Sequence, residues 1–285
     1  MKFPKIMGIL NVTPDSFSDG NEKNINAISK NNGDTNKSST VNIDFVEQKI
    51  KQLLVDGADI IDVGGESTRP NSDEVTVETE LSRVLPTVKL IKTKFPNVRI
   101  SVDTRKSEVA EESLRHGAEM INDVSGLQFS PEIAEIVAKY NKELVIMHSK
   151  GLPKNMQNNP HYENVVTDVF NFLQEKILFA KNKNVNKIFV DVGIGFGKTT
   201  EHNLELLRNL KYFENLETDL LLGISRKRFI GEITQIENPI DRDFPTVLIH
   251  SLLLNQINVK IIRVHNVFLT NQLRNIHNKI FSNFS

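Results

Sequence analysis

The stretch VEQKIKQLLVDGADIIDVGGE, residues 46–66, contains one complete unit of the fold. In its first half, Val46, Ile50, Leu53 and Leu54 recur at the spacing of an amphipathic helix, and Gly57 suits the end of that helix. Its second half, 59–66, is short, mostly apolar and rich in isoleucine and valine, which is typical of a buried strand. The stretch therefore predicts a helix that is followed at once by a buried strand.

Similar apolar runs recur along the chain, and each ends in polar residues. The runs are 6–12, 59–66, 99–104, 119–124, 144–149, 188–194, 220–225 and 261–266. Helix-period stretches lie between them, at 46–57, 74–94, 107–117, 131–140, 162–182, 202–210 and about 241–257. Apolar strands that alternate with helices and lack hairpin turns are typical of a parallel sheet covered on both faces. Eight such units predict an α/β fold, a single-domain (β/α)8 TIM barrel over 1–285; an open doubly wound sheet is the alternative.

One segment, 21–42, interrupts the alternation. It is polar and low in sequence complexity, with many asparagine, lysine and serine residues. Such a segment has little apolar surface to bury, so we expect a flexible insert between the first strand and its helix. The sequence shows no internal repeat and no second domain.

Composition excludes several classes of protein. The formal net charge of the 285 residues is −1, which provides no basic field for nucleic acid or an anionic membrane. The chain has no cysteine, so disulfides and thiolate metal sites are excluded. No apolar run reaches the roughly 18 residues that span a bilayer, and the first residues lack the apolar core of a signal peptide. We expect a soluble, cytoplasmic protein with no nucleic-acid or membrane partner.

Polar side chains gather at the ends of the predicted strands. They are Asn11, Glu66 to Pro70, Asp103 to Arg105, Asn122 with Asp123, His148, Asp191, Ser225 to Arg228, and Arg263 with His265. A single polar strand end is explained by helix capping. In a parallel barrel, however, all these ends lie on one face, and active sites form there. The set therefore predicts one active site at the barrel mouth.

The cations of this set indicate a phosphate group. Lys227 follows the seventh strand, while Arg263 and His265 alternate on the eighth and point to the same side. Loops after strands seven and eight of barrels frequently bind phosphate, and a guanidinium fork suits a phosphate or diphosphate. For Arg226 and Arg228 a solvated charge run is an equally good explanation.

The acids and amide of the set indicate a flat heterocycle. Asp103, Asn122 and Asp191 end three strands of the predicted ring. A carboxylate accepts two parallel hydrogen bonds, and an amide both donates and accepts. A 2-amino-4-oxo ring, such as a pterin or guanine, offers the matching edge.

Other motifs fail on spacing. GIGFGKT, residues 193–199, lacks the first glycine of a phosphate loop, because Val192 stands in its place. The histidines lack the spacing of a zinc site, and neither Ser125 nor Ser149 has the context of a hydrolase nucleophile.

The sequence resembles the dihydropteroate synthase family over nearly its whole length, from Ile6 to about Val267. The segments that carry the resemblance are, in order, GILNVTPDSFSDG, GADIIDVGGESTRP, SVDTRKSEVA, GAEMINDVSG, VIMHSKGLPKNMQ, GIGFGKTTEHN, GISRKRFIG and RVHN. Members condense 6-hydroxymethyl-7,8-dihydropterin diphosphate with 4-aminobenzoate, giving 7,8-dihydropteroate and diphosphate. The resemblance implies a transferase of folate biosynthesis that takes these small molecules, uses Mg²⁺, is a sulfonamide target and forms a homodimer.

The resemblance also implies residue roles. The pterin-binding residues would be Asp103, Asn122, Met147, Asp191, Gly195 and Lys227. The diphosphate-binding residues would be Asn11, Arg263 and His265, with Asn11 also placing the Mg²⁺. The aminobenzoate-binding residues would be Phe17, Thr68, Arg69, Pro70, Phe196 and Arg228. The catalytic residues would be Asp103, Lys227, Arg263 and His265, with Asp103 stabilising a pterin carbocation.

Departures from the family pattern leave specific points open. The resemblance implies that residues 15–20 form a substrate lid, and the insert at 21–42 that follows is longer than the usual bacterial connection. Val192, Asn266 and Arg228 replace residues that are common in the family. Alternatives are a pterin-dependent methyltransferase domain, a Schiff-base aldolase centred on Lys227 and a paralogue that binds pterin without turnover.

Overall fold

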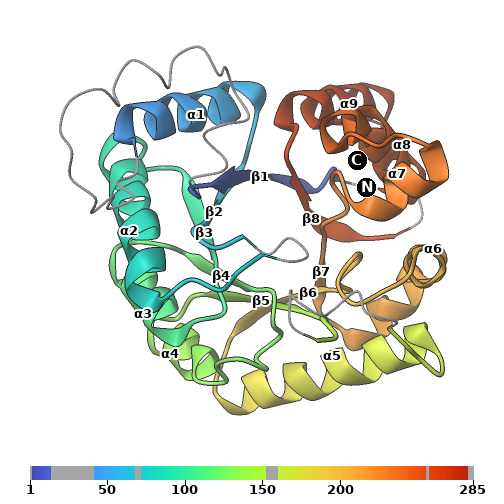
Figure 1. The fold of residues 1–285 in the computed structure, drawn as a ribbon, viewed down its shortest axis with the longest axis horizontal. Coiled ribbons are helices and arrows are strands. Elements are labelled where there is room, and N and C mark those ends of the chain that lie inside the picture. Colours follow the sequence, from blue (N-terminus) through green and yellow to red (C-terminus); the bar gives the residue numbers. More distant parts are fainter. Residues whose placement is uncertain (1, 14–41, 68–71, 152–159, 255–256, 282–285) are drawn as a thin grey trace.

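Eight parallel strands form a closed barrel in the order of the sequence (Figure 1). The computed structural model describes residues 2–13, 42–67, 72–151, 160–254 and 257–281. The strands are β1 (Lys5–Asn11), β2 (Ile60–Gly64), β3 (Arg99–Asp103), β4 (Met120–Asp123), β5 (Glu143–Met147), β6 (Lys187–Asp191), β7 (Asp219–Leu222) and β8 (Val259–Val264). Pairing of β8 with β1 closes the ring. The predicted TIM barrel is confirmed, and the open sheet is excluded.

Helices surround the barrel and cover its outer face (Figure 1). They are α1 (Ile43–Asp56), α2 (Val77–Lys94), α3 (Ser107–Arg115), α4 (Ile133–Lys139), α5 (Val165–Asn182), α6 (Thr200–Arg208), η3 (Leu210–Leu216), α7 (Arg228–Thr234), η4 (Pro239–Arg242), α8 (Asp243–Leu254) and α9 (Val267–Phe281). Helix α1 shows how the sequence sets these bounds. The Asn42 side chain accepts from Phe45 N–H at its start, and Gly57 ends it with φ 104°.

Helix α7 was not predicted, because its seven residues are too few to show a helical period. The last helix, α9, begins at Val267, where the Asn266 side chain accepts from Leu269 N–H at 3.0 Å. No helix among the described residues is both long and apolar enough to cross a membrane.

The barrel interior changes from apolar to polar along the strands. Its apolar layer consists of Met7, Ile60, Met120, Val145, Phe189, Leu221 and Ile261. Side chains alternate along a strand, so in β2 the residues after Ile60 that share its direction are Asp62 and Gly64. Polar residues therefore lie above the apolar layer, toward the carboxyl ends of the strands.

Candidate active site

Strand register places three of the predicted residues, Asn11, Asp103 and Asn122, in one row that also contains Gly64. Asn11 pairs with Gly64, Gly64 with Asp103, and Asp103 with Asn122, across β1 to β4. On the far side of the ring, Met147 pairs with Asp191. Gly64 leaves space in this row, because a Cβ there would lie only 3.2 Å from Asn11 Oδ1. The predicted convergence of the strand ends is thus present in the barrel.

Arg263 of β8 reaches past β1 to carboxylates on β2 and β3. Its Nε donates to Asp62 Oδ2 and its Nη2 donates to Asp103 Oδ2, both at 2.6 Å. Asn122 Nδ2 also donates to Asp62 Oδ2, at 3.3 Å. Asp62 was not among the predicted site residues, although a charged residue inside an apolar strand could have identified it. Asp62 thus contacts two of the predicted residues, Arg263 and Asn122. Arg263 in turn contacts a third predicted residue, Asp103.

Burial and neighbouring charges change the pKa values in this cluster. Burial raises the pKa of Asp103 to about 7; the Arg263 charge opposes that rise, and the Asp62 charge adds to it. Although burial opposes it, the charges of Asp62 and Asp103 raise the pKa of Arg263 above its ordinary value. Arg263 is therefore a permanent cation, whereas Asp103 gains or loses its proton near neutral pH.

Lys227 lies at the mouth beside β6. Its Nζ donates to the carbonyl oxygen of Ile194 and lies 4.7 Å from the centre of the Phe196 ring. Burial lowers the pKa of Lys227 to about 8, and the charge of Asp191 opposes this shift. Burial also raises the pKa of Asp191, whose Oδ1 accepts from Gly193 N–H at 2.8 Å. Lys227 and Asp191, which were both predicted to bind pterin, thus lie close enough for each charge to affect the pKa of the other group.

The segment 193–197, which follows Asp191 and contacts Lys227, is held in place by hydrogen bonds from Lys198. The Lys198 Nζ donates to the carbonyl oxygens of Gly193 at 2.8 Å and Phe196 at 3.1 Å. It also lies 2.8 Å from His148 Nδ1. Burial lowers the pKa of His148 to about 2, so the ring is neutral and Nδ1 accepts from the lysine. Lys198 was set aside with the failed phosphate-loop motif, yet it anchors the segment that contacts Lys227.

His265 is placed by a contact from the end of β7. Its Nδ1 lies 3.0 Å from Ser225 Oγ, and the same hydroxyl accepts from its backbone N–H at 3.1 Å. Its neighbour Asn266 donates to Asp243 Oδ2 at 2.9 Å. An aspartate at 266 would face the Asp243 carboxylate, so this departure from the family pattern has an electrostatic reason.

The two arginines beside Lys227 do not join the barrel cluster. Arg226 forms a two-pronged ion pair with Asp243, at 2.6 and 2.8 Å. Arg228 begins α7, its side chain is 80% exposed, and its Nε lies 2.6 Å from Glu232 Oε1. The alternative explanation as a solvated charge therefore describes Arg228, whereas Arg226 is a partly buried partner of Asp243.

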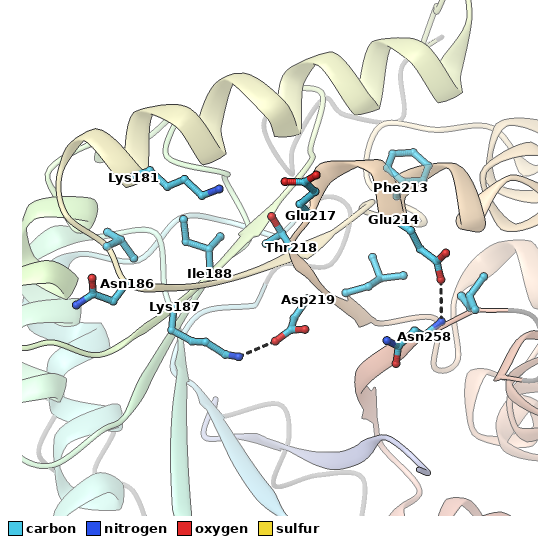
Figure 2. Close-up of a pocket in the computed structure, with 13 residues that line it drawn as sticks. Lys181, Asn186, Lys187, Ile188, Phe213, Glu214, Glu217, Thr218, Asp219 and Asn258 are labelled. Carbon is cyan, nitrogen blue, oxygen red and sulfur yellow. Dashed lines mark hydrogen bonds and ion pairs between the residues drawn. The ribbon is translucent and has the colours of Figure 1, made fainter. Parts of the chain in front are cut away.

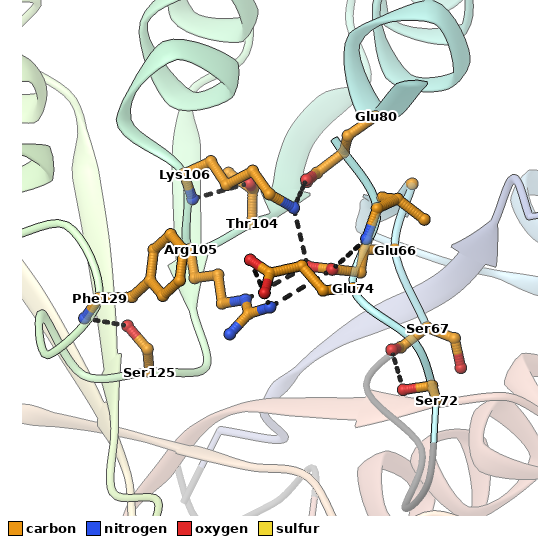
Figure 3. Close-up of polar contacts among 12 residues, drawn as sticks. Glu66, Ser67, Ser72, Glu74, Glu80, Thr104, Arg105, Lys106, Ser125 and Phe129 are labelled. Carbon is orange, nitrogen blue, oxygen red and sulfur yellow. Dashed lines mark hydrogen bonds and ion pairs between the residues drawn. The ribbon is translucent and has the colours of Figure 1, made fainter. Parts of the chain in front are cut away.

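A buried ionic network supports the connection between β2 and α2 (Figure 3). The Glu66 carboxylate accepts from Lys106 Nζ at 3.0 Å and from Arg105, and it also accepts from Val75 N–H at 3.0 Å. Lys106 Nζ donates to Glu80 Oε2 at 2.6 Å. Glu66 thereby joins both ends of the connection that contains residues 68–70. Thr68, Arg69, Pro70 and Phe17 themselves lie outside the described residues.

A cavity of about 470 Å³ lies at the other end of the barrel (Figure 2). Lys187, Asp219 and Asn258, which begin or precede β6 to β8, line it, and Lys187 pairs with Asp219 at 2.6 Å. None of the predicted site residues lines this cavity. It lies at the amino-terminal face of the barrel, whereas the active sites of TIM barrels lie at the carboxyl-terminal face.

Within the described part of the chain, no group of three or more histidine, aspartate or glutamate side chains could enclose a metal ion. Asn11 nevertheless offers a side-chain oxygen at the mouth. Mg²⁺ usually keeps several waters and binds substrate phosphates through only one or two protein ligands. These residues fit an Mg²⁺ ion carried mainly by a diphosphate, and they do not fit a metal held by protein alone.

Comparison with known proteins gives a consistent result. The family described as pterin binding enzyme matches residues 7–265. The dihydropteroate synthase of Haemophilus influenzae is 40% identical over 276 residues, which cover 96% of this chain and 92% of that protein. The Escherichia coli K12 enzyme is 40% identical over 272 residues, covering 94% and 88%.

Solved structures agree with these relatives. The dihydropteroate synthase of Yersinia pestis in a sulfonamide drug complex has a TM-score of 0.85 at 39% identity, covering 98% of this chain and 94% of that chain. The Xanthomonas albilineans dihydropteroate synthase with 4-aminobenzoic acid has a TM-score of 0.82 at 37% identity, covering 97% and 93%. The similarity extends across the whole barrel.

Proposed function

The chain belongs to the family of pterin-binding enzymes and is a dihydropteroate synthase, and from that premise we propose how its residues share the reaction. The enzyme joins 6-hydroxymethyl-7,8-dihydropterin diphosphate to 4-aminobenzoate and releases 7,8-dihydropteroate and diphosphate. The observation that carries the assignment is the barrel cluster of Asp103, Asn122 and Arg263, opposite Asp191 and Lys227.

The pterin lies among the carboxylates and the amide. Asp191, Asn122 and Asp103 pair with its N–H groups and ring nitrogens, since carboxylates accept and an amide does both. Lys227 donates to the ring from a position set by Ile194 and Phe196. Met147 and Gly195 complete the walls. Gly195 supports this role, because a Cβ there would lie 3.1 Å from Lys227 Cδ and restrict the lysine.

Arg263 and His265 bind the diphosphate. Arg263 remains charged at any working pH, and two of its five N–H groups are used in the bonds to Asp62 and Asp103. His265 is oriented by Ser225. Asn11 would hold the Mg²⁺ ion, which neutralises the charge of the diphosphate leaving group when it is bound.

The chemical step requires no protein nucleophile. The bond between the pterin methylene carbon and the diphosphate oxygen breaks, and its electron pair leaves with the diphosphate. Arg263 and His265 stabilise that charge, while ionised Asp103 stabilises the positive charge on the pterin. The aminobenzoate nitrogen then bonds to the methylene carbon and loses a proton.

The aminobenzoate enters beside Phe196. The backbone carbonyl oxygen of Phe196 accepts a hydrogen bond from Lys198, which holds the residue in place. The Phe196 ring faces the Lys227 ammonium. Phe17, Thr68, Arg69 and Pro70 contribute the rest of this pocket. Arg228 acts at its rim, reaching the carboxylate of the aminobenzoate only after it leaves Glu232.

Two variants test the division of roles. Asp191→Ala should abolish pterin binding, because it removes the acceptor of the ring N–H groups. Arg263→Ala should weaken diphosphate binding more than aminobenzoate binding. Titration calorimetry with pterin, inorganic pyrophosphate and 4-aminobenzoate separates these effects. Pterin affinity that is intact in Asp191→Ala would refute the assignment of the pterin site.

Two copies of the chain pair through α8. Four apolar side chains recur at four-residue spacing from η4 along α8, and all are exposed. They are Ile240 (49%), Phe244 (63%), Leu248 (49%) and Leu252 (67%). A contiguous exposed apolar face of this kind is typical of an interface, and two-fold homodimers are the most frequent assemblies. Sedimentation should show a dimer for the parent and a monomer for Leu248→Glu. Leu178→Glu, which changes an exposed leucine on α5, should remain dimeric.

A further inference from the structure

Asp62 is the deepest charged residue of the barrel cluster and has no assigned role. Its side chain is 0% exposed, and it precedes Gly64, the register partner of Asp103, by two residues. Asp62 Oδ2 accepts from Arg263 and Asn122, whereas its Oδ1 has no hydrogen-bond partner within the described part of the chain. Arg263 is its only ion-pair partner among the same residues.

The carboxylates of Asp62 and Asp103 each accept from one of the two N–H groups on the same edge of the Arg263 guanidinium. Nε and Nη2 lie on the same side of this planar group and normally form a fork that binds both oxygens of one carboxylate. Here Nε goes to Asp62 and Nη2 goes to Asp103. Asp103 is thus bonded to Arg263 through one oxygen only, and its other oxygen stays available.

We propose that Asp62 is a positioning residue that keeps Arg263 from closing on Asp103 as a two-pronged ion pair. With Nε held at Asp62, Asp103 keeps one oxygen for the pterin and can exchange the other. Without Asp62, both prongs of the guanidinium turn to Asp103, and pterin must then compete with Arg263 for that carboxylate. This inference rests on the proposed role of Asp103 in pterin binding.

The difference in burial between Asp62 and Asp103 supports these two separate roles. Asp62 lies within β2 and is fully enclosed, so it does not exchange partners with a ligand. Asp103 ends β3 at the mouth and is 7% exposed. The Asn122 amide also holds Asp62 Oδ2 in place, which keeps the anchor fixed while Asp103 changes partners.

Five variants test the proposal by calorimetric binding of 6-hydroxymethylpterin, which carries no diphosphate. Asp62→Leu should weaken binding by about tenfold, the loss typical of one charge-assisted hydrogen bond. Asp62→Asn should recover most of the affinity, because its amide oxygen still accepts from Nε. Ser101→Ala is the matched control, since Ser101 is the buried register neighbour of Asp62 and its Oγ has no hydrogen-bond partner among the described residues. It should bind pterin as the parent does.

The remaining two variants, Arg263→Lys alone and Arg263→Lys combined with Asp62→Leu, separate a positioning role from a purely structural one. A lysine cannot form the two-pronged pair, so Asp62→Leu should lose almost no further affinity when combined with Arg263→Lys. An equal loss in both backgrounds, or parent-like affinity of Asp62→Leu, would overturn the proposal. A parent protein that binds no pterin would instead refute the proposed pterin site, so the two failures are distinguishable.

Discussion

At the scale of single residues, Asp103 and Lys227 have pKa values that are shifted toward neutrality from opposite directions. Burial raises the first to about 7 and lowers the second to about 8. The proposed mechanism needs Asp103 ionised and Lys227 protonated. Only pH values between the two pKa values favour both forms.

This pair predicts a bell-shaped pH dependence. As pH falls through about 7, Asp103 gains a proton and can no longer stabilise a cation, so kcat/KM for the pterin substrate should decrease. As pH rises through about 8, Lys227 loses its proton and kcat/KM should decrease again. Lys227→Arg should move the alkaline limb to higher pH. An acid limb near the ordinary aspartate value of about 4 would contradict the buried position of Asp103.

Sequence reasoning at this scale found the residues at strand ends and missed Asp62, which lies in the middle of β2. Asn11, Asp103, Asn122 and Asp191 could be grouped because parallel strands must end on one face. Asp62 could be noticed as a charge inside an apolar strand, but its partner could not be predicted, because the contact with Arg263 joins residues 201 positions apart. For Arg228 the sequence left a solvated charge as one of two alternatives, since its exposure depends on a helix that the sequence did not predict.

At the scale of elements, the segment 193–197 depends on Lys198. Loss of its three hydrogen bonds should free the Ile194 and Phe196 groups that place Lys227. We expect Lys198→Met to lower kcat/KM by tenfold or more, on the order of one to two hydrogen bonds. Lys187→Met, at the opposite end of the barrel, is the control and should stay near parent activity. Similar activities for both variants would contradict the anchoring role.

The network around Lys106 makes a separate prediction about stability. Lys106 lies between Glu66 and Glu80, and all three side chains are buried (Figure 3). Lys106→Met leaves the buried Glu80 carboxylate without its cation, while Glu66 keeps Arg105; the loss should cost about 3–5 kcal/mol in urea unfolding. Lys139→Met breaks the exposed pair with Glu111 and should cost about 0–1 kcal/mol. Equal losses would show that burial of the network is unimportant.

At the scale of the whole molecule, the barrel followed from periodicity alone. Eight apolar runs alternating with helical stretches leave few other arrangements, and the strand order is that of the sequence. The sequence does not show which side chains meet inside the barrel. It therefore could not predict the contacts of Arg263 with Asp62 and Asp103.

The polar insert gives a prediction about the whole fold. Residues 21–41 have little apolar surface, so their deletion should leave cooperative unfolding and the melting temperature nearly unchanged. The deletion must stop before Asn42, because that side chain caps α1. Adding Asn42→Ala to the shortened chain should cost about 1 kcal/mol. Loss of cooperative unfolding in the 21–41 deletion would show that the insert packs on the barrel.

We propose that this barrel uses its strand-end cluster to exchange diphosphate for 4-aminobenzoate. The most direct measurement is diphosphate release from 6-hydroxymethyl-7,8-dihydropterin diphosphate by the purified protein with Mg²⁺, with and without 4-aminobenzoate. We predict sustained release and formation of 7,8-dihydropteroate only when 4-aminobenzoate is present. Tight pterin binding without release under the same conditions would contradict the claim and indicate a barrel that binds pterin but does not turn it over.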